Sequence, residues 1–252
     1  MKRFNSFQIK CLMAFLMVFD HIPHIPGLVP SALEGAFHVL TRCVAVWFAY
    51  LAVEGFLHTK SRLRYNARLF LWAGFMAVGN LIYNKIGAPY HLSIHNNIFL
   101  TLALGVLLLN ILVGDNPVTE WGNRIRSNRE WALRILGTLL VFAAGLFTEG
   151  GVLLLPFILI TYLGRKRIRL RNACCFLLSA ALFLLLFQPY DTPEETLQML
   201  AMNSEFLFIT VLPALSLYDG TRGPNTSLCK YFFYLFYPLH LWVIGIIAFW
   251  FV

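Results

Sequence analysis

The sequence predicts an all-α integral membrane protein, a polytopic bundle of about nine transmembrane helices. Of its 252 residues, 59% are hydrophobic and only 13% are charged. The mean hydropathy is +0.69, and apolar segments alternate along the chain with clusters of Lys and Arg. One soluble core of this size cannot bury so much apolar surface. A lipid bilayer is therefore the expected surroundings of the chain.

The candidate spans are apolar stretches close to the roughly 17 to 25 residues that cross about 30 Å of hydrocarbon. Several are shorter than this, and their connections are brief. We expect one polytopic domain over residues 1–252. The stretches lie near Phe7–Ile22, Ala36–Leu57, Leu69–Tyr83, Ile98–Val113, Trp131–Phe147, Val152–Leu163, Ala173–Phe187, Leu197–Leu217 and Tyr231–Val252.

The basic residues predict the orientation, because short loops rich in Lys and Arg stay in the cytoplasm. With the N-terminus cytoplasmic and the C-terminus outside, only Arg42 and Lys85 of the 20 basic residues fall on the outer side. The cytoplasmic set is Lys2, Arg3, Lys10, Lys60, Arg62, Arg64, Arg68, Arg124, Arg126, Arg129, Arg134, Arg165, Lys166, Arg167, Arg169, Arg171, Arg222 and Lys230.

The net charge of +8 is spread over short loops, where it sets topology and contacts anionic lipid headgroups. No nucleic-acid partner is expected. The five cysteines show neither CxxC spacing nor a disulfide pattern, and no Cys/His motif predicts a metal site. The first apolar segment is followed by no small-residue cleavage site, which favours a retained helix.

Ionisable residues inside apolar segments are the candidates for chemistry, because burying them in a membrane costs about 2.5 to 3.5 kcal/mol each on insertion scales. This chain has few of them. They are Asp20, His21, His38, Arg42, Glu54, His58, Glu149, Glu205 and His240.

Asp20 and His21 lie at the outer end of the first segment. Adjacent helical residues point about 100° apart, so each needs a partner from another helix. One interpretation makes His21 a general base that is oriented by Asp20 or another carboxylate. The other is an ordinary helix end, since Ile22 precedes Pro23.

His240 follows Pro238 within the last apolar segment. A proline kink beside an intramembrane histidine provides a cavity wall. The alternative is a neutral imidazole that bonds a nearby backbone group.

Arg42 offers a planar fork for an anionic group, or it pairs with Glu34 or reaches the outer surface. Glu54 closes the second segment just before a basic stretch with His58, Arg62, Arg64 and Arg68. These side chains could receive the phosphates of a nucleotide-containing donor. They also serve as a positive-inside signal, which composition alone favours.

The ordered motifs resemble those of the TraX family, membrane proteins associated with N-terminal acetylation of conjugative pilin. They cover most of the chain in order. The matching stretches are Ile9–Met17 with Asp20-His21; Arg42, Phe48, Val53–Phe56, His58-Thr59, Tyr65 and Arg68; Asn97–Phe99, Thr101 and Gly105; Glu149–Val152; Leu217–Gly220 with Arg222-Gly223; and Lys230–Tyr234 with Tyr237–His240.

This resemblance implies a multi-pass acyltransferase of the bacterial cytoplasmic (inner) membrane, which uses cytoplasmic acetyl-CoA. The implied acceptor is an amine or hydroxyl, such as the N-terminus of a pilin-like peptide. His21 or His240 would be the base, Asp20 or Glu54 the orienting carboxylate, and Arg42 the acceptor or oxyanion contact. Direct transfer and an acyl-histidine relay both fit. The expected coenzyme A contacts are His58, Arg62, Arg64, Arg68 and Arg222.

Two features depart from the family pattern. Asp219 stands where the family suggests Asn, and His24 and His91 belong to no motif. Family membership alone does not fix an acceptor, so two alternatives stay open. One is O-acetylation of an envelope polysaccharide or lipid-linked sugar. The other is a non-catalytic transporter or membrane chaperone, although no repeated halves support it.

Overall fold

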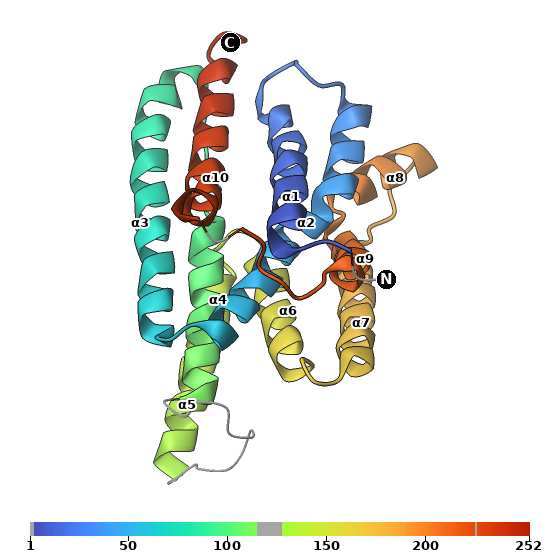
Figure 1. Cartoon of the computed structure of the whole chain (residues 1–252). Helices are drawn as coiled ribbons and strands as arrows, with labels where there is room; N and C mark the ends of the chain where they lie inside the picture. The colour runs from blue at the N-terminus through green and yellow to red at the C-terminus, as the bar shows by residue number, and fades with distance from the viewer. Residues whose placement is uncertain (1–2, 115–127, 225) are drawn as a thin grey trace. The chain divides into compact units, whose positions relative to one another are not determined.

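The computed structural model describes residues 3–114, 128–224 and 226–252. Within these ranges the chain forms α-helices and short 3-10 helices and no strand, apart from an isolated bridge between Phe4 and Tyr218 (Figure 1). The all-α prediction is confirmed. Lys2, Arg124 and Arg126, three of the predicted topology residues, lie outside the described residues.

The elements follow one another along the chain. They are α1 (Ser6–His21), η1 (Ile22–His24), α2 (Ser31–His58), α3 (Arg62–Gly87), η2 (Ala88–Tyr90), α4 (Ile98–Val113), α5 (Asn128–Gly145), α6 (Gly151–Leu163), α7 (Ile168–Leu186), α8 (Pro193–Met202), η3 (Glu205–Thr210), α9 (Val211–Leu217) and α10 (Ser227–Ala248).

Side-chain caps fix several helix starts, because the first N–H groups of a helix have no partner within it. Asn5 accepts from the N–H of Gln8 at 3.0 Å, and the Gln8 side chain returns a bond to the Asn5 N–H. This reciprocal pair begins α1. Asn97 begins α4 by accepting from the N–H of Leu100 at 3.3 Å.

Four helices in the described part of the chain are long and apolar enough to cross a membrane, or five if one bent pair counts as a span. The multi-pass prediction is therefore supported, but nine spans are not confirmed. Helix α6 has 13 residues and α4 has 16, which rise about 20 and 24 Å at 1.5 Å per residue. The apolar run that predicts one helix near Leu197–Leu217 is instead broken, because α8 and the η3–α9 segment meet at 55°.

Contacts divide the chain into two compact units. Unit 1 comprises Met1–Trp47, Gly79–His95 and Asn172–Val252, and unit 2 comprises Phe48–Val78 and Asn96–Arg171. The prediction of a single domain over residues 1–252 stays a prediction.

In unit 1, α1 and the last part of α3 flank α10 (Figure 1). Tyr83 donates its hydroxyl to the carbonyl of Gly245 at 2.9 Å, and the indole N–H of Trp242 donates to Asn80 at 3.1 Å. Gly79 is required here because a Cβ at this position would overlap the Trp242 ring. These contacts hold α10, which carries His240, in place.

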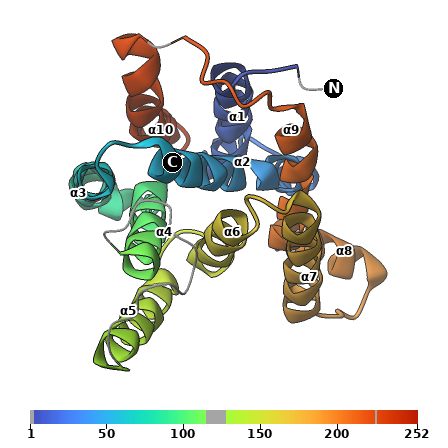
Figure 2. The same cartoon turned by 60° about the horizontal axis from the view of Figure 1, so that its bottom comes forward.

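In unit 2, α4 packs against α5 and α6 (Figure 2). Helix α6 is mostly buried, and Gly105 of α4 lets Ile158 approach its backbone. The turn before α6 has Gly150 in the left-handed region at φ +64°, which favours glycine. Thr101 of α4 donates to the carbonyl of Glu149 at 2.7 Å and fixes this turn.

Candidate functional site

Asp20, at the outer end of α1 in the expected orientation, is held by two neighbouring residues of α2. Its Oδ1 accepts from the hydroxyl of Thr41 at 2.6 Å and from Nη2 of Arg42 at 2.8 Å. Thr41 is buried, and the Asp20 side chain is 24% exposed. Charge-assisted bonds to a carboxylate are among the stronger ones in proteins. Asp20 therefore ties α1 to α2 within unit 1.

The guanidinium of Arg42 is nearly saturated by the protein. Its Nε donates to the carbonyl of His38 at 2.8 Å, and its Nη2 lies 3.1 Å from Nδ1 of His38 as well as bonding Asp20. Its Nη1 has a single long contact of 3.5 Å to Oε1 of Glu205. Nη1 is thus the part of the fork with room for another acceptor.

Three imidazoles gather beside this ion pair. His21 and His240 are both buried, and their ring centroids are 5.2 Å apart. His24, in η1, stacks on His21 with centroids 5.3 Å apart and planes at 29°. Within the described residues no group of three or more His, Cys, Asp or Glu side chains is arranged to hold a metal ion.

The ring of His240 has one bonded nitrogen and one without a partner. Nδ1 lies 2.9 Å from the carbonyl of Phe236, and only a protonated Nδ1 can bond a carbonyl oxygen. In the neutral ring Nε2 then carries a lone pair, and Nε2 is buried without a hydrogen-bond partner in the described structure. The backbone bond considered from the sequence is present, but it leaves the other nitrogen available.

His24 lies outside the apolar helices, and burial lowers the pKa of its imidazole below the ordinary value of 6.5. Its ring is therefore neutral at pH 7. Neutral rings can stack as His21 and His24 do without repulsion between charges.

The remaining predicted carboxylate, Glu54, belongs to unit 2. Its Oε2 lies 3.8 Å from Nδ1 of His58, one helical turn away, and its backbone carbonyl lies 2.9 Å from the same nitrogen. The His58 side chain is 75% exposed, so this contact contributes little to stability.

Three of the predicted coenzyme A contacts lie at the start of α3, also in unit 2. The guanidinium of Arg62 lies 4.5 Å from the ring centre of Phe56, and that of Arg68 lies 5.6 Å from the ring centre of Tyr65. Arg64 is exposed. Nε of Arg68 is buried and has no partner in the described structure.

Arg222, the fifth predicted contact, lies in the loop between α9 and α10 of unit 1. Gly220 and Gly223 flank it at φ +86° and +79°, backbone conformations that glycine adopts readily in turns. Asp219 accepts from the N–H of Thr221 at 2.6 Å, which closes the turn. Arg222 is exposed.

The family model described as "TraX protein" matches residues 6–248, nearly the whole chain. The chain belongs to the TraX family. No curated protein and no solved structure matches this TraX-family chain.

The sequence alone assigns no role to three residues that the structure places at the TraX-family site, although His38 and Glu205 are among the ionisable candidates named from the sequence and only Thr41 is new. His38 and Thr41 share one face of α2 with Arg42, and their spacing of three and four residues is a signal for this proximity. Glu205 is 163 residues from Arg42, and no local pattern predicts that contact.

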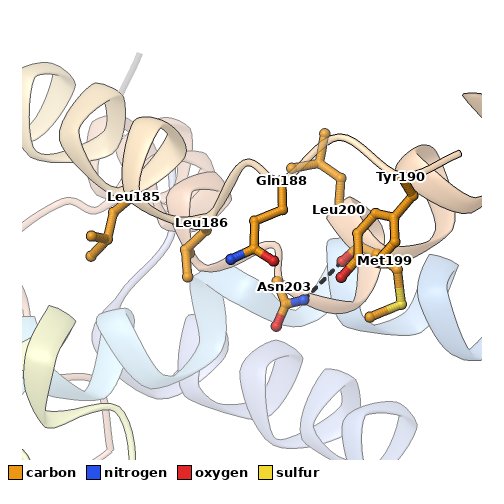
Figure 3. A pocket seen from close by; sticks show the side chains of 7 residues that line it. All are labelled: Leu185, Leu186, Gln188, Tyr190, Met199, Leu200 and Asn203. Carbon is orange, nitrogen blue, oxygen red and sulfur yellow. Dashed lines mark hydrogen bonds between the residues drawn. The ribbon is translucent and has the colours of Figure 1, made fainter.

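A cavity of about 160 Å³ lies elsewhere in unit 1 of this TraX-family protein, between the end of α7 and α8. Gln188 and Asn203 place their amide groups among the aliphatic side chains of its wall (Figure 3). Asn203 donates to the carbonyl of Met199 at 3.0 Å. None of the residues predicted to be functional lines this cavity.

Proposed function

We propose that this TraX-family protein is an integral membrane acetyltransferase of the bacterial cytoplasmic membrane. It takes the acetyl group of cytoplasmic acetyl-CoA and transfers it to an amine or hydroxyl, such as the N-terminus of a pilin-like peptide. Family membership supports the reaction class. The observation that carries the proposal is the buried Nε2 of His240, which has no partner in the described structure.

Attack on a thioester requires a base for the acceptor proton. As the acceptor nitrogen or oxygen bonds the acetyl carbon, its proton passes to Nε2 of His240. The tetrahedral intermediate then expels the coenzyme A thiolate and leaves the acetylated acceptor. The proton on His240 neutralises the departing thiolate, so the histidine returns to its starting form.

Arg42 and Asp20 are suited to stabilise this step. Nη1 of Arg42 retains a donor, and a fixed donor aimed at the developing oxyanion lowers the barrier. Asp20 and the His38 carbonyl hold the rest of the fork. His21 packs against His240 and Asp20 adjoins it, so His21 completes the wall around the base.

We assign the binding of the coenzyme A phosphates to basic residues of unit 2. Arginine side chains bind phosphate groups well, because the planar fork of N–H donors fits the phosphate oxygens and the positive charge of the guanidinium complements their negative charge. Arg68 has a buried, unpartnered Nε, and Arg62, Arg64 and His58 surround the same helix connection.

The test is transfer of radiolabelled acetyl from acetyl-CoA by the purified protein in liposomes. Pilin-like peptide, envelope polysaccharide and buffer serve as separate acceptors. We expect label on one acceptor, and a loss of about 10²- to 10⁴-fold in His240→Ala because general-base catalysis contributes that much.

His95→Ala is the matched control, since His95 is an exposed histidine of the same unit. It should transfer acetyl like the wild type. A folded wild-type protein that neither binds acetyl-CoA nor labels any acceptor would overturn the proposal. Label on the polysaccharide alone would support acetyl transfer from acetyl-CoA and would identify the polysaccharide, not the peptide, as the acceptor.

A further inference from the structure

We infer that His38 is a further catalytic residue, which donates a hydrogen bond from Nε2–H to the oxygen of the reacting acetyl group. The inference rests on the proposed acetyltransferase function and deepens it. In this reaction Nε2 of His240 accepts a proton, whereas Nε2–H of His38 donates a hydrogen bond.

The contacts of Nδ1 determine where the proton of His38 lies. Nη2 of Arg42 is 3.1 Å from this nitrogen. A guanidinium has only donors and is not deprotonated in proteins. Nδ1 must therefore present its lone pair, and the single proton of the neutral ring sits on Nε2.

The competing arrangement has Nδ1–H donate to Asp20 and leaves Nε2 as a base. Oδ1 of Asp20 lies 3.5 Å from Nδ1, which is beyond the usual N–H···O range. The same Oδ1 already accepts from Thr41 at 2.6 Å and from Arg42 at 2.8 Å. A proton on Nδ1 would also face the N–H groups of Arg42.

The imidazole is held but reachable. The carbonyl of His38 accepts from Nε of Arg42 at 2.8 Å, so the ring and the backbone of His38 contact one guanidinium. Its side chain is 23% exposed. Nε2 has no hydrogen-bond partner among the residues that the structure describes, so its N–H can reach a ligand.

Asp20 and its neighbour His21 connect His38 with His240. Oδ1 of Asp20 lies 3.5 Å from Nδ1 of His38, and the ring of the adjacent His21 lies 5.2 Å from the ring of His240, centre to centre. One imidazole offers an acceptor nitrogen and the other a donor. A neutral imidazole that polarises a carbonyl is an established catalytic device.

In the reaction, the N–H of His38 bonds the thioester oxygen and strengthens that bond as negative charge develops on it. The acceptor proton goes to His240 and the thiolate leaves. His38 keeps its own proton throughout, so every proton is accounted for without an additional base.

The test compares His38→Ala with His38→Gln in the reconstituted transfer assay. A glutamine places an amide N–H near the position of Nε2 and cannot act as a base at pH 7. We expect His38→Ala to lower kcat by about 10²- to 10³-fold, the usual effect of losing one oxyanion donor. KM for acetyl-CoA should change little, and His38→Gln should recover most of kcat.

His95→Ala and His95→Gln are the paired controls and should match the wild type. Equal loss of kcat in both His38 variants would overturn the donor role, because a base cannot be replaced by an amide. A fall confined to substrate affinity would overturn it as well.

A second measurement is independent of activity. Nitrogen-15 NMR of histidine-labelled protein, with His38→Ala to assign the signal, should show the neutral Nε2–H tautomer at His38. The Nδ1–H tautomer would overturn the inference. If the wild type transfers no acetyl to any acceptor, the proposed function and the catalytic role of His38 are both wrong. If the wild type transfers acetyl but the His38 variants do not behave as expected, only the role of His38 is wrong.

Discussion

The Arg42 side chain connects the two polar groups of the site, because one fork bonds Asp20 and the His38 carbonyl together. The sequence predicts each of these side chains as an unusual intramembrane polar group. It does not predict their pairing, since Asp20 and Arg42 are 22 residues apart across a helix connection. The alternative pairing of Arg42 with Glu34 is not among its observed contacts, which go to Asp20, His38 and Glu205.

Arg42→Lys should lower kcat/KM for acetyl transfer by about 10²-fold, because an ammonium cannot hold Asp20 and His38 and also present a fixed donor to the substrate. The reconstituted assay measures this effect. Arg169→Lys, at an exposed position of α7, is the matched control and should be neutral. If Arg42→Lys keeps full activity, positive charge alone is sufficient and the fork geometry has no role.

Helix α3 contains two glycines in different surroundings. A Cβ at Gly79 would overlap the indole ring of Trp242, whereas a Cβ at Gly74 would meet nothing within 4 Å. The sequence shows both as glycines within an apolar run and does not distinguish them. The difference arises from packing between α3 and α10, which lie more than 100 residues apart, as in the Trp242–Asn80 contact at a separation of 162.

Gly79→Ala should reduce the free energy of unfolding by about 1 to 3 kcal/mol, the usual effect of overpacking. Gly74→Ala should leave it unchanged or raise it by up to about 1 kcal/mol, because alanine favours a helix. Thermal unfolding of both variants in detergent measures the difference. Equal unfolding temperatures would mean that Trp242 moves aside without loss.

The sequence does not predict the break between α8 and η3. Asn203 and Ser204 interrupt a run that reads as one helix, without a glycine or proline at the break. Periodicity and composition do predict α2, α3 and α10, because long apolar runs with polar ends determine where such helices form. Glu205, just after the break, contacts Arg42 at 3.5 Å, and no local pattern contains that contact.

For the whole molecule, the distribution of Lys and Arg predicts a cytoplasmic N-terminus and an outer C-terminus. A phosphatase reporter that folds only outside the cytoplasm should be active when fused after Val252 and inactive when fused after Lys60 or Lys166. Blue-white scoring on indicator plates and enzyme assay measure this. Activity after both Lys60 and Lys166 with none after Val252 would reverse the orientation, and activity after only one of the two lysines would contradict the expected cytoplasmic location of that basic loop.

Helices α6 and α7 differ both in length and in how much of their surface the protein covers. Helix α6 has 13 residues and is largely enclosed by its own unit. Helix α7 has 19 residues, and only 11% of its most apolar 18-residue stretch is buried. A helix that meets lipid must match the thickness of the hydrocarbon, and mismatch is relieved by tilt or by deforming the bilayer. A helix enclosed by protein is free of that requirement. Lipid chain length should therefore act on this protein through α7, while the short interior helices keep their packing in thick and thin membranes alike.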